Sequence, residues 1–160
     1  MRVLIAFDKF KDSLTAPEAC EIAAEALQKK QPHWQISQCP LTDGGEGFAA
    51  ILTRASHGQI HQQIVTGPRG APVNASFGIV TLCNIPTAAR SLLDLPTGIG
   101  DTASIALIEM ATASGLALLK NEERDPWHTT TYGTGELIKC AIELGAEAIL
   151  LGVGGSATND

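Results

Sequence analysis

The feature that most constrains the fold is a short apolar run that leads directly into glycines. Residues 148–151 read Ala-Ile-Leu-Leu, which has the length and character of a strand buried in a parallel sheet. Gly152, Gly154 and Gly155 come next, and small polar residues follow them. Glycines let a backbone approach an anion closely, and the amide groups of such a turn can point at it. The stretch therefore predicts a phosphate-binding turn at a strand end.

Other interpretations of this stretch stay open at the level of sequence. Its pattern Gly152-x-Gly154-x-x-Ala157 is close to the dinucleotide-binding fingerprint, whereas the Lys-Ser/Thr ending of a P-loop is missing. A tight strand-to-helix turn without any ligand would also need glycines. Because a strand and turn without a following helix form an unfinished unit, we expect the chain to be truncated, the N-terminal portion of a longer protein.

The net charge and the spacing of the cysteines indicate which partners and which compartment to expect. The formal net charge is −6 and no basic cluster is present, so neither nucleic acid nor an anionic membrane is an expected partner. No apolar run has the length of a membrane span, and Asp8 interrupts the first apolar stretch too early for a signal peptide. The four cysteines are widely spaced, which is typical of free thiols. We expect a cytoplasmic protein.

The first part of the chain reads as two β–α units. Residues 2–7 predict a strand, and the polar loop 8–13 follows at its carboxyl end, where open α/β sheets bind ligands. Thr15 and Glu18 form a capping-box pattern with a proline between them, which predicts a helix to about Lys30. Residues 34–39 predict the second strand.

A glycine-rich loop, Asp43-Gly-Gly-Glu-Gly47, opens the second helix. Asp43 can cap a helix that starts at Gly44, with Glu46 as the reciprocal acid. That interpretation does not explain three glycines in four positions, because glycine weakens a helix. The close approach of a ligand would explain them. The helix is expected to continue to about Ala55.

The pattern changes after residue 58. Residues 59–66 alternate and predict a strand, a Gly-Pro-Arg-Gly turn follows, and residues 73–82 predict its hairpin partner. Residues 88–95 are a candidate third strand. We therefore place a domain boundary near 58, with 1–58 as the first part of one domain and 59–160 as the start of an inserted one.

The last third of the chain contains another polar helix start. Residues 104–119 fit a strand in their first half and a helix in their second. Thr131 or Thr134 is expected to cap a helix that runs to Leu144. Threonine hydroxyls and glycine amides at a helix start suit an anion, although capping explains them equally well. It stays open to which of the two domains residues 131–160 belong.

Taken together, these loops resemble those of the bacterial class I glycerate kinase family, of the glycerate 2-kinase type. The resemblance covers the whole chain and departs from the family at Lys9 and Asp12 in the first loop. It implies an α/β fold in which a flavodoxin-like parallel-sheet domain carries a second, inserted α/β domain, with the active site between them. The motifs that carry it are Ala6–Ala16, Asp43–Gly47, Ile108–Ala111 with Ser114–Leu116, Thr129–Ile138 and Gly154–Asp160.

The resemblance implies ATP-dependent phosphorylation of D-glycerate, with Mg²⁺ as the metal and 2-phosphoglycerate as the favoured product, in glyoxylate-type organic-acid metabolism. Two alternatives stay open: a nucleotide-dependent oxidoreductase, from the dinucleotide-like pattern, and a catalytically inactive binding module, from the first-loop departures. A polypeptide of residues 1–160 is expected to be inactive by itself.

Residue chemistry assigns roles to the loop residues, and the resemblance supports their positions. Lys11 is expected to pair with a phosphate or with the glycerate carboxylate. Asp43 and Asp160 are candidates for holding Mg²⁺ or for accepting the hydroxyl proton. These three are the predicted catalytic residues. The predicted binding residues are Asp8, Lys9, Ser13, Gly44, Gly45, Glu46, Thr131, Gly133, Thr134, Gly154, Gly155, Ser156, Thr158 and Asn159.

Overall fold

A computed structural model describes residues 1–11 and 13–159, so Asp12 and the predicted catalytic Asp160 lie outside the described residues. The chain forms two compact units, Met1–Asp43 and Gly44–Asp160, which are described separately below. Helix α2 belongs to the second unit. The predicted domain boundary near residue 58 concerns the whole protein and stays a prediction.

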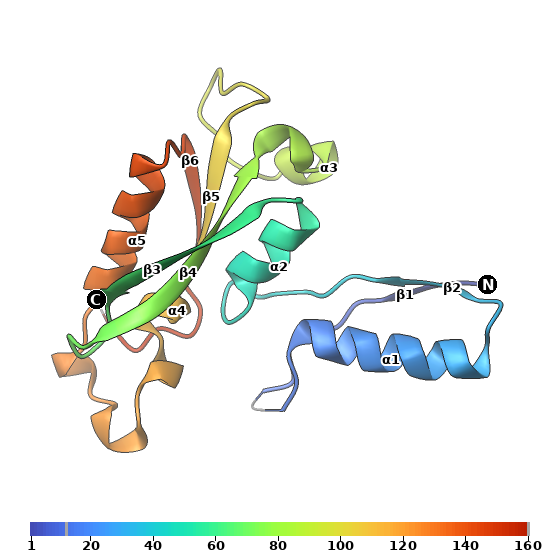
Figure 1. Ribbon diagram of the computed structural model, residues 1–160, viewed down its shortest axis with the longest axis horizontal. Helices are drawn as coiled ribbons and strands as arrows, with labels where there is room; N and C mark the ends of the chain where they lie inside the picture. The colour runs from blue at the N-terminus through green and yellow to red at the C-terminus, as the bar shows by residue number, and fades with distance from the viewer. Residues whose placement is uncertain (12, 160) are drawn as a thin grey trace. The chain divides into compact units, whose positions relative to one another are not determined.

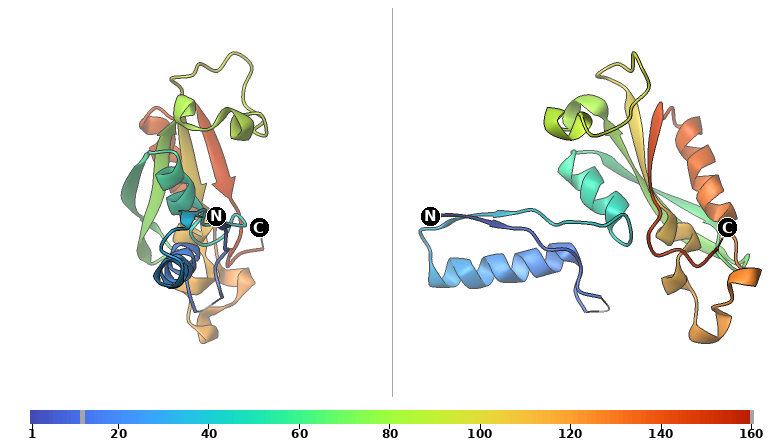
Figure 2. Two further views of the ribbon diagram at one scale, coloured as in Figure 1. Left: turned by 90° about the vertical axis from the view of Figure 1, so that its right-hand side faces the viewer. Right: turned by 180° about the vertical axis from the view of Figure 1, so that it is seen from behind.

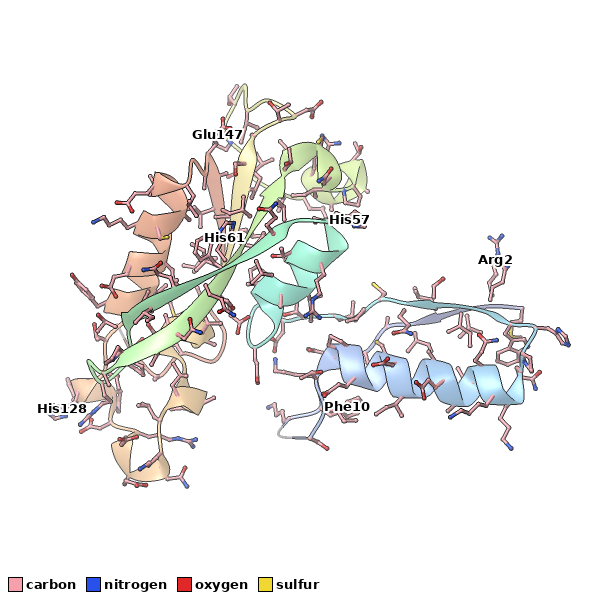
Figure 3. The ribbon with its side chains drawn as sticks, in the orientation of Figure 1. Arg2, Phe10, His57, His61, His128 and Glu147 are labelled. Atoms are coloured by element: carbon pink, nitrogen blue, oxygen red, sulfur yellow. The ribbon has the colours of Figure 1, made fainter. Side chains whose placement is uncertain are left out.

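The first unit is a β–α–β arrangement. Strands β1 (Arg2–Ile5) and β2 (Gln35–Gln38) pair in parallel, and helix α1 (Ala16–Lys30) covers one face of the pair (Figure 1). Ile5, Cys20 and Ala24 form the small core between them. Arg2 points away from α1 (Figure 3), and its Nε donates to Gln35 Oε1 at 3.1 Å.

Helix α1 starts as the sequence predicts. Thr15 is the N-cap residue, and its hydroxyl accepts a hydrogen bond from Glu18 N at 3.4 Å. Glu18 Oε2 in turn accepts from Thr15 N at 2.9 Å, which completes the capping box. The predicted capping box and helix end are both confirmed.

The second unit is built on a four-stranded sheet with the order β3-β4-β5-β6. Its first two pairs are antiparallel and β5–β6 is parallel, so the hairpin and the strand before the glycine turn are both confirmed. Strand β6 is half-buried rather than fully buried, because it is the last strand of the described sheet. The four strands are β3 (Gln59–Thr66), β4 (Pro72–Thr81), β5 (Ser104–Glu109) and β6 (Ala148–Gly152).

Helices cover both faces of this sheet (Figures 1 and 2). Helix α2 (Phe48–Ala55) packs on the face that carries Ile105 and Leu107, while α5 (Tyr132–Glu143) packs on the face that carries Ala106 and Ile108. The alternation along β5 follows from the two-residue period of a strand. The short α4 (Met110–Ser114) packs on β4 and α5.

One local prediction is wrong, and another is confirmed in part. The candidate strand at 88–95 is wrong, because a helical turn, α3 (Thr87–Arg90), follows Pro86 and is tied back to the loop by an ion pair between Arg90 and Asp101. Residues 104–119 divide into β5 and α4, followed by a 3₁₀ turn at Leu116–Leu118. Other 3₁₀ turns are Leu82–Asn84, Asn121–Glu123 and Pro126–His128.

Candidate phosphate-handling loops

In the first unit, the loop after β1 and the segment after β2 meet. The strands are parallel, so their carboxyl ends lie at one edge. Backbone pairing continues past them, from Cys39 N to Ile5 O and from Leu41 N to Phe7 O, both at 2.8 Å. This extension brings the polar ends of both segments together.

The predicted charged residues of the first unit meet at this edge. Lys9 Nζ pairs with Asp43 Oδ1 at 2.9 Å, and the Asp43 side chain is still 61% exposed. Asp8 Oδ1 accepts from Lys9 N at 2.7 Å, which fixes the start of the loop. Lys11 and Ser13 are exposed. The structure therefore pairs two of the predicted residues, and the Asp43 carboxylate stays largely exposed.

The glycine-rich loop Asp43–Gly47 does not form the predicted Asp43 cap. Helix α2 starts at Phe48, and its N-cap residue is Gly47 in the left-handed conformation, at φ 90°. Phe48 N donates to Gly45 O at 3.0 Å, while Glu46 is exposed. The Asp43–Glu46 capping box is wrong, because a left-handed glycine, rather than an acid, turns the chain into the helix.

The two glycine turns of the second unit pack against each other. Gly154 N donates to Gly44 O at 3.0 Å. A Cβ atom at Gly154 would lie 2.8 Å from Gly45 N, and one at Gly152 would lie 2.6 Å from Gly44 O. Close backbone approach does require these glycines, as predicted, but the approaching group at Gly152 and Gly154 is protein backbone rather than a ligand.

The end of the Gly152–Thr158 turn carries a pair of hydroxyl groups. Ser156 Oγ and Thr158 Oγ1 are 2.7 Å apart, and Thr158 N donates to Ser156 Oγ at 3.0 Å. Gly155 has φ 75°, which favours glycine at this position. Both hydroxyl residues are half-buried and Asn159 is exposed. One hydroxyl proton is used within the pair, so this end of the turn presents one hydroxyl donor that an anion can use.

Neighbouring segments hold this turn in place. Leu116 N donates to Gly155 O at 2.8 Å, and Ala157 N donates to Ser114 O at 2.9 Å. The hydroxyl of Thr129 donates to Ala157 O at 2.9 Å. Three of the motifs that carry the family resemblance are thus in direct contact within the second unit.

At the start of α5, part of the predicted ligand set has structural roles. Thr131, one of the two predicted capping residues, is at the N-cap position, but its side chain makes no capping hydrogen bond. A Cβ atom at Gly133 would overlap the carbonyl oxygen of Thr66, so close packing on β3 requires glycine there. Thr134 is buried inside the helix, and its hydroxyl bonds that of Ser114 at 2.8 Å.

Glu109 is an acidic residue of the second unit that is absent from the predicted site residues. Glu109 ends β5, lies beside Gly152 in the register and is only 4% exposed. Its Oε2 accepts from Ala49 N at 3.3 Å. A single acid at the end of the apolar run Ile105–Ile108 is the sequence signal that could have identified it.

The described residues contain no group of three or more His, Cys, Asp or Glu side chains that could hold a metal ion. His57, His61 and His128 lie apart in the second unit (Figure 3), and His61 stacks on Phe77. Mg²⁺ commonly uses one or two carboxylates together with substrate phosphates and water. The exposed Asp43 carboxylate fits that mode of binding better than an all-protein cage.

The sequence matches the profile of the glycerate kinase family over residues 3–160. The chain belongs to this family. It is 44% identical over 160 residues to the glycerate kinase of Bacillus subtilis and 42% identical over 160 residues to the glycerate 2-kinase of Escherichia coli, in each case over 100% of this chain and 37% of the relative.

A solved structure supports the fold of this glycerate kinase family member. The crystal structure of a protein provisionally named glycerate kinase 2, from Salmonella typhimurium LT2, is similar with a TM-score of 0.70 and 40% identity. The match covers 100% of this chain and 38% of that one. The resemblance stated from the loop motifs is therefore confirmed, together with a mixed α/β fold of two small sheets. Within the part of the chain that is described, no helix has the length and apolar character needed to cross a bilayer.

Proposed function

We propose that this chain carries part of the active site of an enzyme that transfers a phosphoryl group from ATP to D-glycerate, with 2-phosphoglycerate as the favoured product. The observation that carries the proposal is 42–44% identity over all 160 residues to relatives named glycerate kinase and glycerate 2-kinase. The chain spans about 37% of the length of those relatives, so the activity is proposed for the whole protein.

For the whole protein we propose a flavodoxin-like domain into which a second α/β domain is inserted, acting in the cytoplasm. The parallel β1–α1–β2 arrangement of the first unit supports the flavodoxin-like assignment. The three-layer second unit supports a separate α/β domain.

The proposed chemistry makes modest demands on the protein. Phosphoryl transfer needs the donor and the acceptor hydroxyl held in line and the transferred charge neutralised. Mg-ATP would supply the phosphoryl group and much of that neutralisation. Asp43 would hold the metal or accept the proton of the glycerate hydroxyl, and the ion pair with Lys9 would hold its carboxylate in place. Lys11 would pair with an anionic group of a substrate.

In the second unit, the hydroxyl pair Ser156–Thr158 would donate to an oxygen of a phosphate or carboxylate through the O–H that is not used within the pair. They are half-buried, already aligned by a 2.7 Å contact, and lie on a turn held by Ser114 and Leu116. A fixed donor costs little reorganisation when charge develops on the substrate.

The geometry does not favour a dinucleotide-dependent oxidoreductase. In a dinucleotide site, the glycine of the turn lets the backbone approach the pyrophosphate. Here, Gly152 and Gly154 approach the backbone of Gly44 and Gly45 instead. Packing between two loops therefore explains both glycines of the pattern Gly152-x-Gly154-x-x-Ala157.

The proposal is tested with Asp43→Asn in the intact enzyme, assayed by glycerate-dependent ADP release. Loss of the charge is expected to lower kcat by about a hundredfold or more if Asp43 acts as a base or metal ligand. Asp101→Asn is the matched control, because Asp101 is also an exposed aspartate in an ion pair, with Arg90 at 2.7 Å. Near-normal turnover in Asp43→Asn would remove Asp43 from the chemistry.

The same assay tests the function itself. Saturable glycerate binding by the unsubstituted enzyme without ADP release would indicate a binding module. Phosphorus NMR of the product would show which hydroxyl is phosphorylated.

A further inference from the structure

Glu109 is a buried acid that the proposed mechanism leaves unused. Its exposed fraction is 4%. Among the described residues, it is the only buried acidic residue. Burial of a carboxylate is costly unless hydrogen bonds compensate for the lost water. Its position therefore needs a reason in the surrounding structure.

That reason lies at the start of helix α2. Gly47, the N-cap residue, has no side chain to accept from the first amide groups of the helix. Glu109 Oε2 accepts from Ala49 N instead, at 3.3 Å, and comes from the end of β5. A carboxylate at a helix N-terminus also interacts favourably with the helix dipole. Glu109 thus takes the position that an N-cap side chain, or a bound anion, would otherwise occupy.

The same carboxylate lies where the two glycine turns meet. Glu109 pairs with Gly152 in the parallel β5–β6 register. A Cβ atom at Gly152 would lie 2.7 Å from Cδ1 of Phe48, the first residue of α2. Gly154 N donates to Gly44 O at 3.0 Å, so the turn before α2 and the turn after β6 share a contact. A side chain that ties α2 to β5 also fixes the spacing of these two turns.

We infer that Glu109 is a positioning residue that holds the Gly44–Gly47 turn against the Gly152–Gly155 turn. Its carboxylate takes the anion position at the start of α2, so this helix end is not a phosphate site. In the second unit, the hydroxyl pair Ser156–Thr158 remains as a donor for a substrate anion. The expected effect on kcat rests on the proposed function. The expected effect on the two glycine turns does not.

Two substitutions in the intact enzyme separate the effect of the length of the Glu109 side chain from the effect of its charge. Glu109→Gln keeps an oxygen at the same reach and removes the charge, whereas Glu109→Asp keeps the charge and is too short to reach Ala49 N. We expect Glu109→Gln to stay within about threefold of the normal kcat, and Glu109→Asp to lose about tenfold to a hundredfold, with smaller changes in KM, because small misplacements of reacting groups are costly.

Thr53→Val is the matched control. It removes another buried hydrogen bond of α2, from Thr53 Oγ1 to Ala49 O, without touching the glycine turns. Its kcat is expected to stay normal. Hydrogen–deuterium exchange gives a second measurement: peptides that cover 44–49 and 152–155 should both exchange faster in Glu109→Asp, but not in Glu109→Gln.

The outcomes distinguish this inference from the proposed function. If the unsubstituted enzyme shows no glycerate turnover, the proposed function fails, and hydrogen exchange still tests the role of Glu109. If the enzyme is active and Glu109→Asp keeps normal kcat and exchange, the inference is overturned. It is also overturned if Glu109→Gln loses as much activity as Glu109→Asp, because a retained hydrogen-bond acceptor should rescue positioning.

Discussion

At the scale of single residues, the capping box of α1 makes a measurable electrostatic prediction. The pKa of Glu18 is lowered from 4.5, first because Thr15 N donates to its carboxylate and second because the Thr15 hydroxyl does so as well. Thr15→Ala removes the second donor and leaves the first. We expect the pKa of Glu18 to rise in this variant but to stay below its ordinary value, as measured by carbon-13 NMR titration.

The sign of the linked stability change follows from the lowered pKa. This contact stabilises the folded state fully above pH 4.5, and its contribution is lost as the pH falls through the folded-state pKa of Glu18. Thr130→Ala serves as a control, since the hydroxyl of Thr130 contacts Tyr132 N and not Glu18. An unchanged Glu18 pKa in Thr15→Ala would contradict the capping geometry.

At the scale of elements, packing between the two glycine turns predicts unequal effects of the same substitution. Gly154→Ala would place a Cβ 2.8 Å from Gly45 N, and overpacking of this kind costs about 1–3 kcal/mol. Gly135 lies in α5, and an added Cβ would meet no atom within 4 Å beyond its chain neighbours and the nearby backbone of its own helix. Gly135→Ala should therefore stabilise by up to about 1 kcal/mol through helix propensity. Denaturant unfolding of both variants measures this, and equal stabilities would refute the packing.

At the scale of the whole molecule, the two units are expected to differ in their ability to fold alone. The first has one helix on a two-stranded sheet, which is marginal in water, and Leu4 is 66% exposed. The second has a core on each face of its sheet. A peptide of residues 1–43 should show no cooperative thermal transition, whereas residues 44–160 should unfold cooperatively. Circular dichroism melts test both, and cooperative melting of 1–43 would show this account to be incomplete.

The sequence by itself determined the features that depend on near neighbours. The capping box at Thr15 and Glu18 spans three residues, and the hairpin of β3 and β4 depends on alternation and a short turn. The apolar run at 148–151 predicts β6 for the same reason. The loop motifs were specific enough to indicate the family, which the comparisons confirm.

Only the tertiary structure decided what the glycines and the polar residues contact. Ala49 and Glu109 are 60 positions apart, so no local pattern shows that Glu109 replaces the missing cap of α2. The same holds for Gly154, whose close neighbour is Gly45, and for Thr134, whose hydroxyl bonds Ser114. Glycines that admit a ligand and glycines that admit another backbone have the same sequence signature, because both satisfy one steric requirement, the absence of a Cβ atom.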